Sequence, residues 1–240
     1  NDTVLVILPT FNEAGTLAEV VGRLRETPDV SSILIIDDAS TDGTRDIADG
    51  LAAADPCITV LHRAGKQGLG TAYLAGFAWA AGRDYTWIVQ MDADGSHLPA
   101  QLPDLLAAAR AGAGLVIGTR WIDGGSVYGW PWYRRLISRT GTWVARIALR
   151  SRLRDITSGF RVLDPDWVAR LPEGEISAQG YGFQVEVAWN LERRDCPIAE
   201  VPITFVERQA GYSKMSLGIV LEALHLVLRH GWNLRFRHSR

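Results

Sequence analysis

The sequence lacks the features that mark several protein classes. It has only two cysteines, Cys57 and Cys196, in 240 residues, which speaks against a disulfide framework and favours reduced, buried thiols in a cytosolic compartment. It has no apolar run of about 18 residues and no signal-peptide pattern, so we expect no membrane-spanning segment. It also has no internal repeat, low-complexity tract or long linker. These absences leave a globular protein with an ordinary core.

Two common nucleotide-binding motifs are missing as well. The glycine-rich stretch GKQGLG at 65–70 matches neither the P-loop pattern nor Gly-x-Gly-x-x-Gly. Kinase-like and dinucleotide-dependent dehydrogenase functions therefore lose support. Glycines in such a turn still let backbone N–H groups approach a phosphate or ribose closely.

Charge is unevenly distributed along the chain. Residues 1–100 carry 6 Lys and Arg against 14 Asp and Glu, whereas residues 101–240 carry 19 against 13. A run without lysine or acid contains seven arginines: Arg134, Arg135, Arg139, Arg146, Arg150, Arg152 and Arg154. Such a patch favours a local anionic partner, although it could also be a solvated helix face. A pI near 6.2 and the lack of a second basic surface argue against nucleic acid.

Apolar runs alternate with helical periodicity through the first half. Strands are predicted at 4–8, 33–36, 58–61, 87–91 and 115–118, with helices between them. Continuous apolar strands are typical of a parallel sheet covered on both faces, whose ligands bind at the carboxyl ends of the strands. Polar residues follow the strands at those ends: Asn12, Glu13, Asp37, Asp38, Lys66, Asp92, Asp94 and Arg120.

The stretch WIVQMDADGSHLP at 87–99 organises this edge. Residues two apart on an extended backbone point to the same side, so Asp92 and Asp94 are expected to lie together. Two carboxylates about 4 Å apart repel by roughly 4 kcal/mol at an effective dielectric near 20. Mg²⁺ or Mn²⁺ shared with a diphosphate would remove that cost. The alternative is a solvated loop in which Asp94 or Ser96 caps the next helix.

Asp38 has two interpretations. It could accept a hydrogen bond from a base or ribose, or it could cap the turn into the following helix.

An ordered set of motifs resembles a known family. The first half contains PTFNE (9–13), DDASTDGT (37–44), KQGLGTA (66–72), MDADGSH (91–97) and GTR (118–120). These resemble the family 2 inverting glycosyltransferases with a GT-A fold. The second half contains TSGFRVL (157–163), GYGFQVE (180–186), EVPITF (200–205) and RQAGYSK (208–214), which are similar to dolichol- or polyprenol-phosphate mannose synthases.

This resemblance, over about residues 4–230, implies a Rossmann-like α/β fold of the GT-A type, with a mostly parallel central sheet and helices on both faces. We expect a single domain over 1–240, in which about 1–120 binds the nucleotide and about 121–240 faces the acceptor and the membrane. The implied reaction transfers mannose from GDP-mannose to a polyprenyl monophosphate, with inversion, at the cytoplasmic face of a membrane. The implied cofactor is Mg²⁺ or Mn²⁺.

The resemblance also assigns roles to residues. It implies nucleotide-sugar contacts by Pro9, Phe11, Glu13, Ile36, Asp38, Lys66, Asp92, Ala93, Asp94, Arg120, Arg208 and Lys214. Asp92 and Asp94 would hold the metal. Phe11 stands where the family often has Tyr, so a hydroxyl contact is absent there. Ser96 replaces a Gln of some members, which removes a third protein ligand.

The acceptor's chemistry suggests a mechanism without a general base. A phosphate monoester has a second pKa of about 6 and is already anionic at neutral pH. Cations must bring it to an anionic donor, and Arg binds phosphate bidentately. We therefore expect Arg139, Arg208 and Lys214 to position the acceptor phosphate. Asp94 with its metal, Arg120, Arg208 and Lys214 form the expected catalytic set.

Membrane contact is expected to be peripheral. Trp130, Trp132 and Tyr133 precede the arginine cluster and fit a membrane–water interface. The apolar segment 217–228 could lie in that interface, pack on a partner or belong to the core. A separate membrane-anchoring subunit or domain could contribute. Glu186 could be a buried partner of an arginine or lie on the polar face of a helix.

Other functions remain open on the sequence. A polyprenyl-phosphate glucose synthase using UDP-glucose would differ mainly in its donor, and a non-catalytic nucleotide-sugar-binding protein could keep the fold. A processive polysaccharide synthase would need long transmembrane segments and a Gln-x-x-Arg-Trp motif, and the chain has neither.

Overall fold

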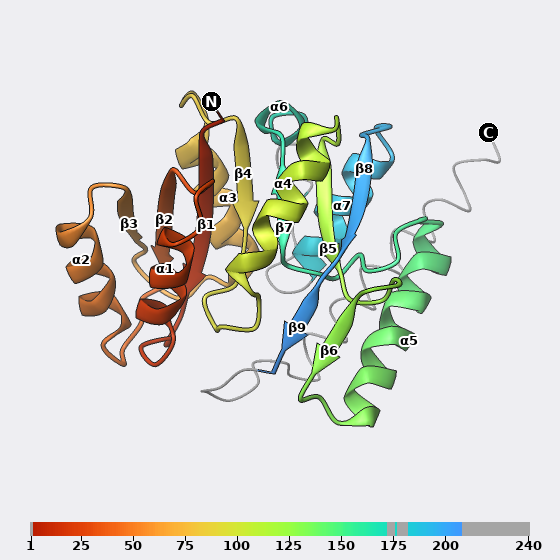
Figure 1. Ribbon diagram of the computed structural model, residues 1–240, viewed down its shortest axis with the longest axis horizontal. Helices are drawn as coiled ribbons and strands as arrows, with labels where there is room; N and C mark the ends of the chain where they lie inside the picture. The colour runs from red at the N-terminus through yellow and green to blue at the C-terminus, as the bar shows by residue number, and fades with distance from the viewer. Residues whose placement is uncertain (1, 172–175, 177–181, 208–240) are drawn as a thin grey trace.

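The computed structural model describes residues 2–171, 176 and 182–207, and its centre is a seven-stranded sheet (Figure 1). The spatial order is β3-β2-β1-β4-β7-β5-β8. The strands are β1 (Val4–Thr10), β2 (Ser32–Asp37), β3 (Ile58–His62), β4 (Trp87–Gln90), β5 (Leu115–Thr119), β7 (Arg161–Leu163) and β8 (Ile198–Pro202). Six run parallel, and β7 is antiparallel to both neighbours. The predicted mostly parallel α/β sheet is confirmed.

Helices cover both faces of the sheet. One layer contains α1 (Leu17–Arg25), α2 (Thr44–Ala54) and α4 (Leu102–Arg110), the last preceded by the short helix η1 (Pro99–Gln101). The other contains α3 (Leu69–Ala80), α7 (Gly182–Glu192) and the end of α5 (Trp132–Leu149). Along β1, Val4, Val6 and Leu8 pack under the first layer, while Leu5 and Ile7 pack under the second. This two-sided burial explains why the strands read as continuous apolar runs.

The remaining elements lie beside the main sheet. Strand β6 (Ser126–Tyr128) pairs with β9 (Thr204–Val206) in a parallel ribbon, next to which α5 runs in Figure 1. The one-turn helix α6 (Pro165–Val168) follows β7.

Strand β7 carries a fully buried arginine. Arg161 donates to the carbonyl oxygens of Ser158 (2.8 Å), Gln184 (2.8 Å) and Ile156 (2.7 Å). Burial lowers the pKa of Arg161 to about 9. One guanidinium thereby ties β7, the loop before it and α7 together.

Several expectations need correction. Cys196 is buried as expected, but Cys57 is half-buried; both are free. Trp130 is buried, so it does not contribute an interface aromatic, whereas Trp132 and Tyr133 are exposed. Glu186 lies inside α7, whose residues 182–191 are all buried, which excludes an exposed polar face. Segment 217–228 lies outside the described residues. Within the described part, no helix has both the length and the apolar character to cross a bilayer.

Candidate functional site

Polar residues from distant parts of the chain gather at one edge of the sheet. Strands β1, β2, β4 and β5 point the same way, so their carboxyl ends share an edge. Glu13, Asp38, Asp92 and Arg120 follow these four ends. The edge is therefore where a parallel sheet would bind a ligand.

Asp94 lies in a turn, and Asp92 directly precedes that turn. Strand β4 ends at Gln90, and Ala93 and Asp94 adopt a turn, so the alternation expected of an extended strand does not apply to them. Gly95 has a φ of +77°, a conformation that favours glycine. Asp94 is 3% exposed and its Oδ1 accepts from the Ser96 backbone N–H at 2.9 Å.

The expectation that Asp94 or Ser96 caps the next helix is wrong. The residue preceding η1 is Leu98, and the one preceding α4 is Gln101. The carboxylate of Asp94 instead accepts a hydrogen bond from the Ser96 backbone N–H and so stabilises the turn that follows β4.

Neighbouring side chains fix the aspartate turn. The Thr16 hydroxyl donates to the Ala93 carbonyl at 2.8 Å, and the Tyr73 hydroxyl lies 3.5 Å from Asp92 Oδ1. Burial raises the pKa of Tyr73, so its hydroxyl stays a donor. A Cβ on Gly159 would sit 3.3 Å from Asp92 Oδ2, so this glycine gives the carboxylate room. Such support holds a site in one geometry.

The donor set at this turn suits a hard divalent cation. Within the described residues, no group of three or more His, Cys, Asp or Glu side chains could hold a metal. Two carboxylates are the usual protein share for Mg²⁺, with the other ligands coming from substrate phosphates and water. Asp92 and Asp94 therefore fit a metal that is completed by a diphosphate.

His97 packs beneath the turn. Its Nδ1 accepts from the Asp92 backbone N–H at 3.3 Å, and its ring lies between Phe160 and Phe205. Burial is the main cause that lowers the pKa of His97 to about 4. The imidazole is therefore neutral at pH 7 and serves as an acceptor.

This burial predicts a pH-dependent stability. The unfolded chain, in which the pKa of His97 is about 6.5, binds a proton more readily than the folded one, so stability falls as the pH drops from about 6.5 to about 4. The loss from this group should approach about 3 kcal/mol. Urea unfolding in metal-free buffer measures the free energy of unfolding of the wild type and of His97→Gln. As the pH falls from about 6.5 to about 4, the wild type should lose stability relative to the variant. A pH-independent difference would contradict the assignment.

Asp38 holds the glycine-rich loop. Its carboxylate accepts from the backbone N–H groups of Gln67 (3.0 Å) and Gly68 (2.9 Å) and from Arg63 Nη1 (2.7 Å). The start of α2 is bound instead by Asp42, which accepts from the Thr44 backbone at 3.1 Å. The capping alternative for Asp38 is therefore wrong. Arg63 was not found from the sequence, because nothing local marks it as the partner of Asp38.

The same loop carries a cation over an aromatic ring. Lys66 Nζ lies 4.0 Å from the centre of the Phe11 ring. The structure thus brings Phe11, Asp38 and Lys66 to the same part of the edge. That these residues bind a nucleotide stays a prediction.

Arg120 is bound by an acid that sequence reasoning missed. Its Nε and Nη2 donate to the two carboxylate oxygens of Asp155 at 2.7 and 2.8 Å, and Nη2 also donates to Thr157 at 3.1 Å. Both Arg120 and Asp155 are buried. A bidentate pair of this kind fixes the guanidinium in place. The only sequence signal was that Asp155 is the first acid after the arginine cluster.

The remaining predicted site residues lie in the core, on α5 or outside the described residues. Pro9 lies opposite Ile36 in the β1–β2 register, and the Ile36 side chain is buried in the core under α3. Glu13 is buried beside α1. Arg139 lies on α5, with its guanidinium 5.7 Å from the Trp121 ring. Arg208 and Lys214 lie outside the described residues.

The sequence is similar to those of known proteins over nearly its whole length. The model of the family Glycosyl transferase family 2 matches residues 5–171. The chain is 49% identical over 237 residues to "Undecaprenyl-phosphate mannosyltransferase" of Micrococcus luteus, covering 99% of the chain and 97% of that protein. It is 44% identical over 237 residues to "Polyprenol monophosphomannose synthase" of Mycolicibacterium smegmatis, covering 98% of the chain and 89% of that protein.

A solved structure with a similar fold is glucosyl-3-phosphoglycerate synthase from Mycobacterium tuberculosis, in complex with Mn²⁺, UDP and glucosyl-3-phosphoglycerate. Its TM-score is 0.72 at 21% identity, over 97% of this chain and 81% of that one. At this identity the likeness shows the fold alone.

Proposed function

Because the chain belongs to glycosyl transferase family 2, we propose that it transfers mannose from GDP-mannose to a polyprenyl monophosphate, with inversion at the sugar carbon. The observation that carries this proposal is the identity of 49% and 44%, over nearly the full length, to two proteins named for lipid-phosphate mannose chemistry. The arrangement of charges at the sheet edge supports it.

The donor would lie along the edge from β2 to β4. Phe11, Lys66 and the loop held by Asp38 form the face for the nucleoside, with Pro9, Glu13 and Ile36 behind it. Asp92 and Asp94 would hold Mg²⁺ or Mn²⁺ at the diphosphate, with Ala93 between them. When bound, the ion supplies Lewis-acid stabilisation of the leaving diphosphate.

The acceptor would need no general base. Its phosphate is anionic at neutral pH, so the protein's task is to hold two anionic substrates together. Arg120 is fixed by Asp155, which places its guanidinium at the end of β5. We assign acceptor-phosphate contacts to Arg139, Arg208 and Lys214, and catalytic assistance to Arg120, Arg208 and Lys214.

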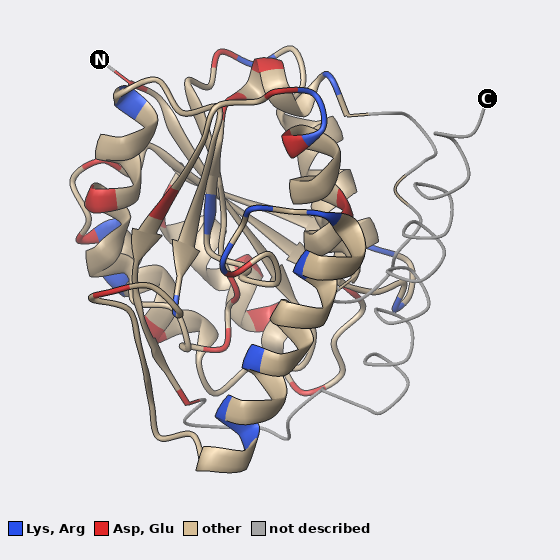
Figure 2. Cartoon of the chain, turned by 90° about the vertical axis from the view of Figure 1, so that its right-hand side faces the viewer, with Lys and Arg blue, Asp and Glu red and all other residues tan. Residues whose placement is uncertain are grey.

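Helix α5 is the proposed contact with the membrane surface. It contains no acid and, with its arginines, shows only positive bands in Figure 2. Its large exposed apolar side chains are Trp132, Tyr133, Leu136, Ile137, Trp143 and Ile147. Aromatic and apolar side chains beside arginines suit the headgroup region of a bilayer. The proposed association is peripheral, at the cytoplasmic face, with room for a separate anchoring subunit or domain.

A donor panel tests the function. Radiolabelled GDP-mannose, UDP-glucose and UDP-galactose are each incubated with one polyprenyl phosphate, with and without EDTA. We expect labelled lipid from GDP-mannose alone and none with EDTA. Transfer from UDP-glucose would instead make the protein a glucose synthase, and tight donor binding without any product would make it a nucleotide-sugar-binding protein.

A further inference from the structure

The motif EVPITF at 200–205 begins with a carboxylate to which the proposed function assigns no role. Glu200 lies in β8, opposite Ile117 of β5 in the parallel register. Its neighbours Ala199 and Val201 pack under the layer of α1, α2 and α4, so the alternation along the strand turns Glu200 to the other face of the sheet. Glu200 is half-buried there. A partly buried carboxylate is costly unless it accepts hydrogen bonds, so its donors indicate what it does.

Three donor groups of the protein converge on one oxygen of Glu200. Its Oε1 accepts from the backbone N–H of Arg154 at 2.7 Å and from that of Asp155 at 3.2 Å, and the Thr119 hydroxyl lies 3.2 Å away. Hydrogen bonds to an ionised acceptor are roughly twice as strong as those between neutral groups. Because two consecutive N–H groups share one acceptor, both the position and the orientation of the backbone at Asp155 are fixed against the end of β5.

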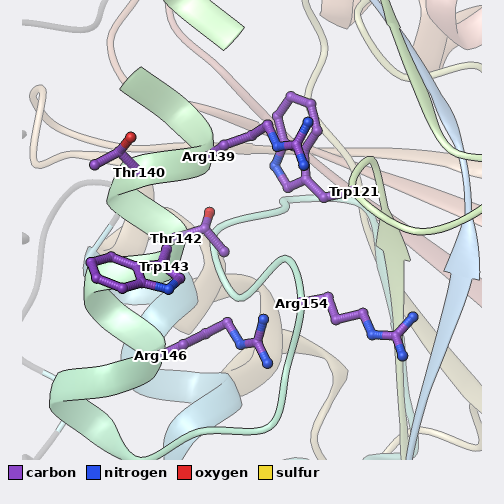
Figure 3. Close-up of a pocket in the computed structure, with 7 residues that line it drawn as sticks. All are labelled: Trp121, Arg139, Thr140, Thr142, Trp143, Arg146 and Arg154. Carbon is purple, nitrogen blue, oxygen red and sulfur yellow. The ribbon is translucent and has the colours of Figure 1, made fainter. Parts of the chain in front are cut away.

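The segment that Glu200 holds has no regular structure of its own. Residues 151–160, between α5 and β7, form neither helix nor strand. Figure 3 shows this segment across from α5, with Arg154 on it lining a cavity of about 310 Å³. A second carboxylate, that of Glu192 at the end of α7, accepts from the Arg152 backbone N–H at 2.7 Å. The conformation of the segment therefore depends on contacts from neighbouring elements, and Glu200 supplies the one at Asp155.

Asp155 carries this support to Arg120. The Asp155 side chain is fully buried, and its Oδ2 accepts from the Arg120 backbone N–H at 3.0 Å and from Nε at 2.7 Å, while Oδ1 accepts from Nη2 at 2.8 Å. The guanidinium also lies 5.3 Å from the ring of Phe205, the last residue of the same motif. Since two parallel hydrogen bonds join the guanidinium to the carboxylate, a displaced Asp155 would displace Arg120 with it.

We propose that Glu200 is a positioning residue that sets the place of Arg120 by holding the backbone of Asp155. The inference rests on the proposed function, in which Arg120 assists the transfer. A displacement of about 1 Å at a catalytic group can lower a rate about 100-fold, so loss of this support should lower kcat while the fold remains. If Glu200 only joined the edge strand β8 to its neighbours, its loss would lower stability and leave kcat unchanged.

Transfer assays on three variants test the role of Glu200. Glu200→Ala removes the acceptor oxygen and should lower kcat by about 10- to 100-fold. Glu200→Gln keeps an oxygen that can accept from both N–H groups, so it should recover kcat to within about 3-fold of the wild type. The matched control is Glu192→Ala, which removes a comparable hydrogen bond from the Arg152 N–H of the same segment. It should change kcat by less than about 2-fold.

A double-mutant cycle shows whether Glu200 acts through Arg120. The background is Arg120→Lys, because lysine keeps a positive charge beside the buried Asp155 but cannot form the two parallel hydrogen bonds. Adding Glu200→Ala to this background should lower kcat by less than about 2-fold, because the two losses are not additive when one residue acts through the other. Equal losses in the two backgrounds, or a wild-type kcat in Glu200→Ala, would overturn the proposal.

A measurement that needs no activity separates this proposal from the proposed function. The Arg120 Nε–H group gives a ¹H–¹⁵N NMR signal, identified by its absence in Arg120→Lys, and Glu200→Ala should shift this signal more than Glu192→Ala does. If the wild type transferred no sugar from any donor, the proposed function would be contradicted, and the signal would decide alone: a shift supports the positioning role and an unchanged signal overturns it. Circular dichroism verifies folding. If Glu200→Ala fails to fold, Glu200→Asp, whose side chain is one carbon shorter, should show the same loss and shift.

Discussion

Replacing Asp94 by asparagine is expected to lower kcat/KM for mannosyl transfer by about 10³-fold. The substitution removes the charge that would hold a divalent ion against the leaving diphosphate, and such stabilisation contributes several kcal/mol to the barrier. It keeps the Oδ1 acceptor for the Ser96 backbone N–H, so the turn should survive. The loss should appear in transfer assays at saturating Mg²⁺ or Mn²⁺, with little change in the unfolding midpoint.

Asp84→Asn is the matched control, because Asp84 is exposed and precedes β4, whereas the turn follows the other end of that strand. It should retain the wild-type rate within about 2-fold, as surface substitutions usually do. If Asp94→Asn kept more than about a tenth of the wild-type activity, the aspartate turn would not be the metal site.

The second large effect concerns stability. Arg161→Met should lower the free energy of unfolding by about 4 kcal/mol or more, because methionine removes the three buried hydrogen bonds that the guanidinium donates to the carbonyl oxygens of Ile156, Ser158 and Gln184. Since a domain is stable by only about 5–15 kcal/mol, this variant should be close to unfolding at 37 °C. Urea denaturation followed by circular dichroism measures the change.

Arg170→Met provides the comparison on the surface. Arg170 is exposed and stacks on Trp167 at 4.3 Å, a contact worth about 0.5–1 kcal/mol. A loss at Arg161 no larger than that at Arg170 would show that the three carbonyls find other donors, and the account of the buried guanidinium would be wrong.

The sequence was most informative where the chemistry is local. Polar residues placed directly after apolar strands, such as Asp92 and Arg120, fall on one edge because parallel strands end together. The fold class follows from the same periodicity. The conformation of the aspartate turn was missed because Gly95 redirects the backbone within two residues, which a strand pattern does not reveal.

Partners distant in sequence could not be read from the chain. Asp155 binds Arg120 across 35 residues, and Asp38 binds the Gly68 backbone across 30. Strand β7 is only three residues long and begins with arginine, so neither its length nor its composition predicts a central strand. Burial of Arg161 becomes acceptable only because three carbonyls converge on it, which is a property of the assembled fold.

The position of β7 has a consequence for synthesis on the ribosome. The ribosome synthesises β1 through β5 first. In the sheet, β7 lies between β4 and β5 and pairs with both, and it is synthesised some 40 residues after β5. Until β7 is synthesised, β4 and β5 each have an unpaired edge, and unpaired strand edges can pair with strands of other chains. A fragment ending near residue 120 would therefore be prone to aggregate, and a translational pause before residue 161 would prolong the exposure of the nascent protein.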